Sequence, residues 1–167
     1  MVETQKTKKK ILHLSLIKML RVYAVLRRFG YLDPLIYSLD PNVIKDTLTQ
    51  ATREYLSYMQ SAVEKEAFIY NRKTRNTEKA KIPCLAILKQ SDIKELFVRG
   101  YKDVVHEIVK GESSHEKEYC ISPVVFLKDG NIRVSVPSEF ELKSFMNELN
   151  KNIYVARELV ELAMGGS

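Results

Sequence analysis

The chain has 167 residues and a mass of 19.3 kDa, enough for one well-buried core or a core with a small appended domain. Hydrophobic residues make up 45% and charged residues 29%, which sets it apart from disordered, collagen-like and membrane-spanning chains. The formal charge is +6, and residues 1–81 carry 16 basic and 8 acidic side chains. This basic first half favours an anionic partner, nucleic acid first and a membrane surface second.

The cysteine content and the N-terminal pattern favour an intracellular protein. Two cysteines are too few for a four-thiolate metal site or for the disulfide framework of a secreted domain. The basic start followed by an apolar stretch has the order of a signal peptide, but basic residues interrupt the apolar part and no small-residue cleavage site follows. No run of 18 apolar residues occurs. We therefore expect a cytoplasmic protein.

A helical repeat of apolar residues marks the first predicted element. Apolar side chains recur at steps of three and four over residues 11–29, and Gly30 follows at the place of a left-handed C-terminal cap. A second apolar row widens the arc, so the predicted helix buries more than one narrow stripe. Another side of the helix carries a basic edge formed by Lys18, Arg21 and Arg28.

A second helix and a basic loop are predicted next. Asp40 and Pro41 form an N-cap and first-turn pair, and apolar residues at helical spacing extend the helix to about Tyr70. Residues 71–81 contain no large apolar side chain and carry five basic residues against one acidic. Because such a segment is unsuited to a core, we expect a mobile basic loop there.

The sequence changes from polar and basic to apolar after this predicted loop. The short apolar run at 83–89 is bounded by turn signals and predicts a buried strand. Ser91 or Asp92 then caps a predicted helix that ends at Gly111.

An Asp-Gly pair predicts a β-hairpin farther along the chain. Asp129 and Gly130 lie between the apolar segments 119–127 and 131–136, and both central residues of a type I′ turn require positive φ. Pro123 restricts the first of these strands to an edge or a bulge.

The most regular helical repeat of apolar residues in the sequence lies near its C-terminal end. Ser138 begins a capping box, and apolar residues follow at steps of four and three up to Gly165. The predicted fold class is α+β, mainly α: a helical bundle with a small β-containing insertion. Residues 1–81 and 138–167 form the predicted bundle, and residues 82–137 form the small α/β insertion with its hairpin.

Motifs for catalysis and metal binding do not occur in the sequence. It lacks a Walker loop, a Rossmann glycine fingerprint, a His-Glu-x-x-His motif and a Gly-x-Ser-x-Gly motif, so we expect no enzyme, no cofactor and no metal site. We interpret His13 as a packing or interface residue, and His106 and His115 as surface residues. Cys84 and Cys120 either act as small buried apolar groups or form a disulfide if their strands are neighbours.

The basic residues are the candidate nucleic-acid-binding site. If their clusters lie on one side, they would contact a sugar-phosphate backbone with a steep salt dependence and no sequence preference. The alternative is that they only solvate a helix edge and a loop. Tyr58 and Tyr70 are the tyrosines whose positions favour exposure and base stacking. The candidate residues are Lys8, Lys9, Lys10, Lys18, Arg21, Arg27, Arg28, Arg72, Lys73, Arg75, Lys79 and Lys81.

Three parts of the chain together resemble a known family. They are a basic N-terminal helical part that includes residues 8–18, a β-containing insertion around Cys84–Leu88 and Tyr119–Val136, and a closing helix from Phe140. This arrangement resembles the small subunit of the archaeal type I-A CRISPR interference complex, often called archaeal Cascade. The resemblance implies a non-catalytic subunit that packs in copies against neighbouring Cas subunits and helps to hold target DNA in the R-loop. Guide pairing would then supply sequence recognition, and the protein would supply backbone contacts.

Two other functions stay open at the level of sequence. An independent DNA-binding regulator needs a recognition helix after a tight turn, and no helix pair shows one clearly. A peripheral membrane protein anchored by the first predicted helix would use its basic and apolar character, but the broad spread of apolar residues favours burial against protein.

Overall fold

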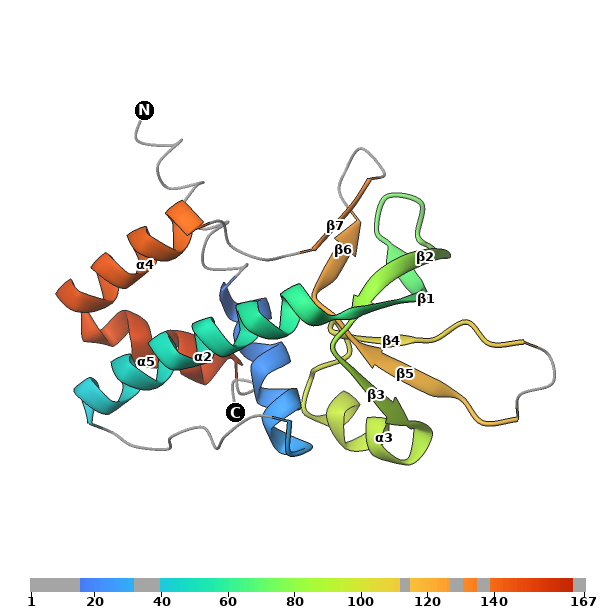
Figure 1. Ribbon diagram of the computed structural model, residues 1–167, viewed down its shortest axis with the longest axis horizontal. Coiled ribbons are helices and arrows are strands. Elements are labelled where there is room, and N and C mark those ends of the chain that lie inside the picture. The colour runs from blue at the N-terminus through green and yellow to red at the C-terminus, as the bar shows by residue number, and fades with distance from the viewer. Residues whose placement is uncertain (1–15, 32–39, 112–114, 127–130, 135–138, 164–167) are drawn as a thin grey trace. The chain divides into compact units, whose positions relative to one another are not determined.

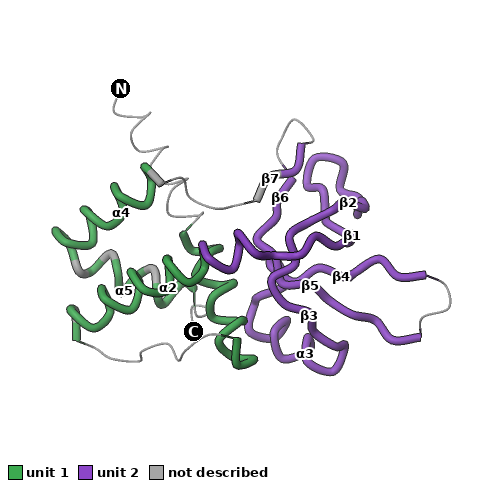
Figure 2. The backbone as a smooth tube through the Cα atoms, viewed as in Figure 1, with its two compact units in different colours: residues 1–55, 136–167 green, residues 56–135 purple. Residues whose placement is uncertain are grey.

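The computed structural model describes most of the chain (Figure 1), namely residues 16–31, 40–111, 115–126, 131–134 and 139–163. The chain divides into two compact units (Figure 2): unit 1 is Met1–Tyr55 with Val136–Ser167, and unit 2 is Leu56–Ser135. Among the described residues, every strand belongs to unit 2.

The N-terminal helix of unit 1 covers residues 16–28 and is buried on most sides. Leu16 and Val25 have no exposed surface, in keeping with the broad apolar arc of the sequence. Gly30 ends the helix with a φ of 81°, and its N–H donates a 3.0 Å hydrogen bond to the Arg27 carbonyl. The predicted glycine cap is therefore confirmed.

Helix α2, Pro41–Ser61, begins with the N-cap that the sequence predicts. The Asp40 carboxylate accepts a 2.9 Å hydrogen bond from the backbone N–H of Asn42, which satisfies a donor that has no partner inside the helix. The predicted extension to Tyr70 is wrong, because a strand begins at Val63. The apolar residues of β1 at 67–70 follow one another without alternating, so their spacing does not distinguish a strand from the end of a helix.

The predicted last helix is two helices, α4 (Glu139–Lys151) and α5 (Ile153–Ala163), which contact each other. Asn152 separates them, and its side-chain oxygen accepts a 3.1 Å hydrogen bond from the N–H of Tyr154. Asn152 therefore caps α5, and the continuous apolar spacing across it does not reveal the interruption. Outside the described residues lie the two predicted ends of this helix, Ser138 and Gly165.

Unit 2 contains a long antiparallel hairpin made of β1 (Val63–Asn71) and β2 (Asn76–Cys84) (Figure 1). The strands pair along their whole length, from Val63 with Cys84 to Asn71 with Asn76. The prediction of a mobile basic loop at 71–81 is therefore wrong. Its only apolar side chain is Ala80, and pairing with Ala67 of β1 buries that small group.

A three-stranded sheet in the order β3-β5-β4 follows the hairpin. Its strands are β3 (Ala86–Lys89), β4 (Val105–Glu107) and β5 (Glu118–Ile121), and both pairings are antiparallel. The predicted strand at 83–89 is present but interrupted at Leu85, which separates β2 from β3. An isolated bridge between Ala67 and Ile108 joins β1 to the segment after β4.

Helix α3, Gln90–Val98, follows β3 and is shorter than the sequence predicts. Gly100 has a φ of 87°, and the N–H of Tyr101 donates a 2.9 Å hydrogen bond back to the Leu96 carbonyl. Gly100 therefore ends the helix, and the predicted end at Gly111 is wrong.

The strand pairing predicted around the Asp-Gly pair is confirmed, but the predicted first strand at 119–127 is divided into β5 and β6 at Ser122 and Pro123. β6 (Val124–Phe126) pairs antiparallel with β7 (Ile132–Val134), and Pro123 directly precedes β6. Outside the described residues lie the turn residues Asp129 and Gly130.

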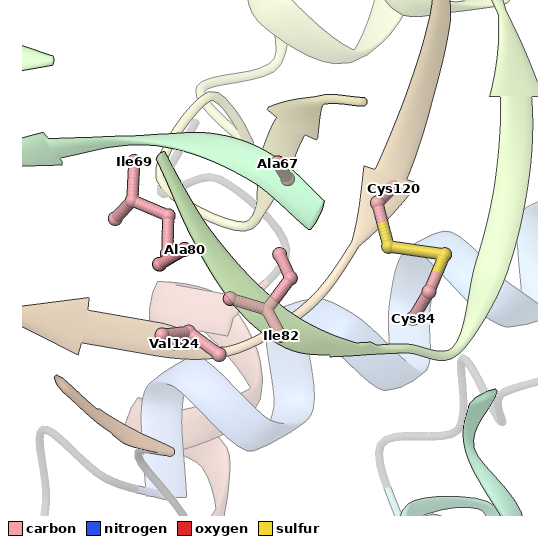
Figure 3. Close-up of a cluster of buried hydrophobic side chains, with 7 residues drawn as sticks. All are labelled: Ala67, Ile69, Ala80, Ile82, Cys84, Cys120 and Val124. Atoms are coloured by element: carbon pink, nitrogen blue, oxygen red, sulfur yellow. A yellow bond between two sulfur atoms is a disulfide. The ribbon is translucent and has the colours of Figure 1, made fainter. Parts of the chain in front are cut away.

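The core of unit 2 forms where the β1–β2 hairpin meets β5 and β6 (Figure 3). Side chains on one face of the hairpin pack against Cys120 and Val124, and the hairpin contributes Ala67, Ile69, Ala80, Ile82 and Cys84. Cys84 and Cys120 form a disulfide with their α-carbons 5.4 Å apart, so the alternative left open by the sequence is decided in favour of the bond.

These findings correct the predicted fold class. The chain is mixed α+β, and its strands do not form a small insertion in a helical bundle. The β1–β2 hairpin adds residues 63–81 to the β-containing part, and these residues are the ones that the sequence assigns to a helix and a loop. A strand of this hairpin buries one face only when it is paired with the other strand. The spacing of apolar residues within one segment does not show which segment is its partner.

One ion pair in unit 2 gives a test by pH. Lys110 donates a hydrogen bond to the Glu118 carboxylate, and this bond holds the pKa of Glu118 below its usual range. The stabilisation from the pair is present above the ordinary carboxyl pKa and is lost as the pH falls through the lowered pKa. We expect Lys110→Met to raise the pKa of Glu118 in an NMR titration. An unchanged pKa would show that the hydrogen bond is not its main cause.

Candidate nucleic-acid interface

The structure places the candidate cations in both units. Unit 1 carries one group on the N-terminal helix: Lys18, Arg21, Arg27 and Arg28. Unit 2 carries the other group on the β1–β2 hairpin: Arg72, Lys73, Arg75, Lys79 and Lys81. Outside the described residues lie Lys8, Lys9 and Lys10.

The cations of the N-terminal helix are less accessible than those of the hairpin. Arg28 is exposed, whereas Lys18, Arg21 and Arg27 are half-buried. Each of the four takes part in at least one interaction with the rest of the chain. Because half-buried side chains have less surface to offer a ligand, the helix is the weaker of the two candidate surfaces.

The tip of the hairpin carries three exposed cations, Arg72, Lys73 and Arg75, in the connection between the paired residues Asn71 and Asn76. Local hydrogen bonds shape this tip. The Asn71 side-chain oxygen accepts a 3.0 Å hydrogen bond from the N–H of Lys73, and the backbone of Arg75 is left-handed, with a φ of 58°. The three cations therefore lie on a turn that local hydrogen bonding and backbone conformation define.

The outer face of the hairpin, defined by Phe68, Tyr70, Lys79 and Lys81, continues the basic surface from the tip. In the register of the hairpin, Lys79 lies opposite Phe68, and Lys81 lies opposite Glu66. Side chains alternate between the two faces of a strand, so both lysines point away from the core formed by Ala80 and Ile82. Lys79 and Lys81 are both exposed.

Two aromatic residues lie on the same outer face. Phe68 is half-buried, and the ammonium nitrogen of Lys79 lies 5.9 Å from the centre of its ring. Tyr70 has 55% of its surface exposed and pairs across the hairpin with Thr77. The sequence pattern correctly selects Tyr70 as exposed, but Tyr58, which it selects as well, is half-buried. It also misses Phe68, whose contact with Lys79 depends on the pairing of β1 with β2.

Three carboxylates lie on the hairpin strands, and their positions decide how far they offset the cations. Glu78 lies on the opposite face from the two lysines and accepts a 3.2 Å hydrogen bond from the Asn71 side chain. Glu66 lies directly opposite Lys81 on the outer face, and Glu64 lies on the same face two residues farther from the tip. Among the residues that the structure describes, no ion pair includes any of the five hairpin cations. The tip and outer face are therefore a cationic surface with aromatic side chains.

The other chemistry-bearing residues lie apart from this surface. His106 is buried and its Nε2 lies 3.0 Å from the Ser122 carbonyl oxygen, so the interpretation of His106 as a surface residue is wrong. His115 is exposed, and His13 lies outside the described residues. In the described part of the chain, no three His, Cys, Asp or Glu residues form a group that could hold a metal ion. None of the described helices has the length and apolar character to cross a membrane.

The fold and this surface define a small α+β protein with an exposed cationic hairpin. A family model described as the type I-A Cascade subunit Csa5 matches residues 5–166. The chain therefore belongs to the Csa5 family, and the resemblance to a small subunit of the type I-A complex is confirmed. Family membership makes the chain a component of a CRISPR interference complex. A search of curated proteins gives no match.

Proposed function

We propose that the chain is a non-catalytic subunit of the complex that packs against other Cas subunits and helps to hold target DNA in the R-loop. The cations of the β1–β2 hairpin contact the sugar-phosphate backbone. Pairing with the guide RNA supplies sequence recognition, so the subunit needs no base-specific contact of its own.

The observation that carries this proposal is the gathering of exposed cations on one hairpin. Arg72, Lys73 and Arg75 lie at the tip, and Lys79 and Lys81 lie on the outer face; within the described residues, none of the five forms an ion pair with a carboxylate. Cations in this state can neutralise phosphates and release counterions without first breaking an ion pair. A subunit of an RNA-guided complex has such a polyanion as its neighbour, which supports the assignment.

The test is target binding by the reconstituted complex over a salt series. We expect the triple variant Arg72→Ala, Lys73→Ala and Arg75→Ala to weaken binding about tenfold or more near physiological salt. The plot of log affinity against log salt should become shallower by about 2 to 3, because each lost phosphate contact removes about 0.7 to 0.9 from the slope.

A matched control removes the same charge elsewhere in unit 2. Lys89, Lys94 and Lys102 are exposed and lie outside the hairpin, so their alanine variants lower the net charge equally. Equal weakening by both triple variants would mean that only net charge matters. Unchanged affinity in the hairpin variant would contradict the proposal, and a footprint of the isolated chain on a defined duplex would favour an independent regulator instead.

A further inference from the structure

We propose that the Tyr70 ring is a stacking platform for an unpaired base, so that the β1–β2 hairpin holds a single strand of nucleic acid. The inference rests on the proposed function and specifies its ligand. In an R-loop, the unpaired strand is the DNA strand that the guide RNA displaces, and we assign the hairpin to that strand.

The surroundings of Tyr70 differ from those of the other aromatic residue on the outer face. Phe68 is half-buried and has the Lys79 ammonium group 5.9 Å from its ring centre. Tyr70 lies opposite Thr77, a small side chain, and 55% of its surface is exposed. The Tyr70 ring is therefore the aromatic surface of the hairpin that a flat ligand can cover.

Cations lie on both sides of this ring along the hairpin. Lys79 is its diagonal neighbour on β2, and Arg72 is two residues farther along the chain at the start of the tip. Diagonal neighbours across an antiparallel pair are about 7 Å apart, so a base on the ring brings a flanking phosphate near Lys79, and the chain continues from Tyr70 into the basic tip that begins at Arg72. This combination of a stacking ring and a basic track is typical of surfaces that bind single strands.

Stacking on the Tyr70 ring also favours binding of a single strand over binding of a duplex. Phosphate contacts alone do not discriminate, because both forms present a charged backbone. Inside a duplex, each base face is covered by the next base pair, whereas an unpaired base can leave the stack and lie against an aromatic side chain. Tyr70 therefore adds affinity only where bases are unpaired.

The experiment measures dissociation constants of the reconstituted complex on three R-loops. In the first the displaced strand is intact, in the second it carries abasic sites throughout, and in the third it is omitted. We expect Tyr70→Ala to weaken binding to the intact R-loop about tenfold, in line with the usual value of one base stack. On the abasic and strand-free R-loops the variant should bind like the unsubstituted complex.

Two variants show whether the effect belongs to the ring. Tyr70→Phe keeps the aromatic face and should retain most of the affinity. Tyr154→Ala removes a tyrosine of unit 1 that is 74% exposed and should have no effect. Because both tyrosines are exposed, their variants should unfold at the temperature of the unsubstituted chain, and this is checked first.

The outcomes separate this inference from the proposed function. If the triple variant of the tip weakens binding but Tyr70→Ala does not, the proposed function stands and the stacking role is overturned. Equal weakening by Tyr70→Ala on all three R-loops also overturns it, because the effect then does not depend on bases of the displaced strand. If neither variant weakens binding, both proposals fail.

Discussion

Replacing Cys84 and Cys120 together by alanine is expected to lower the free energy of unfolding of unit 2 by about 4 kcal/mol. The two cysteines are 36 residues apart in the sequence, and their bond restricts the unfolded chain by closing that loop. In the folded state the bond ties the end of β2 to β5, and both sulfur-bearing residues are buried in the core of unit 2.

The measurement is hydrogen exchange followed by mass spectrometry, because it reports unit 2 separately from unit 1. Peptides from β1, β2 and β5 should exchange much faster in the double variant, while peptides from the N-terminal helix should be unaffected. Reduction of the unsubstituted chain provides a control without any substitution and should give a similar loss. Protection that is the same in the oxidised, reduced and substituted chains would show that the bond does not stabilise unit 2.

Replacing Tyr55 by alanine is expected to cost about 4 kcal/mol, whereas replacing it by phenylalanine should raise stability by about 1 kcal/mol. Tyr55 lies in α2 and has no exposed surface. Burial raises the pKa of its hydroxyl group, which has no hydrogen-bond partner within the described structure. The ring therefore stabilises the fold through packing, while the hydroxyl loses its hydration without compensation.

Thermal and chemical unfolding of the full chain test this opposite effect of ring and hydroxyl. Tyr154→Phe is the matched control, because its hydroxyl belongs to a largely exposed side chain and its removal should change stability by less than about 0.5 kcal/mol. A marked loss of stability in Tyr55→Phe would mean that the hydroxyl has a partner, and the explanation would then be wrong.

The candidate site could be predicted in part. The sequence identifies the cations at 72–81 and the exposed Tyr70, because charge and position alone mark them as unsuited to a core. It assigns them to a mobile loop, whereas the structure holds them on a paired strand and a hydrogen-bonded tip. The pairing places Lys79 over Phe68 and leaves Tyr70 opposite Thr77, and this arrangement is a property of two strands together.

Sequence by itself determined the features that depend on near neighbours in the chain. The glycine cap at Gly30, the N-cap at Asp40 and the pairing of β6 with β7 follow from local backbone preferences and local apolar spacing. Only the tertiary structure decided that residues 63–81 are strands, that Cys84 meets Cys120 and that Ala80 is buried. These features depend on contacts with distant segments, and a strand gains its hydrogen bonds and its buried face from a partner that local spacing does not show.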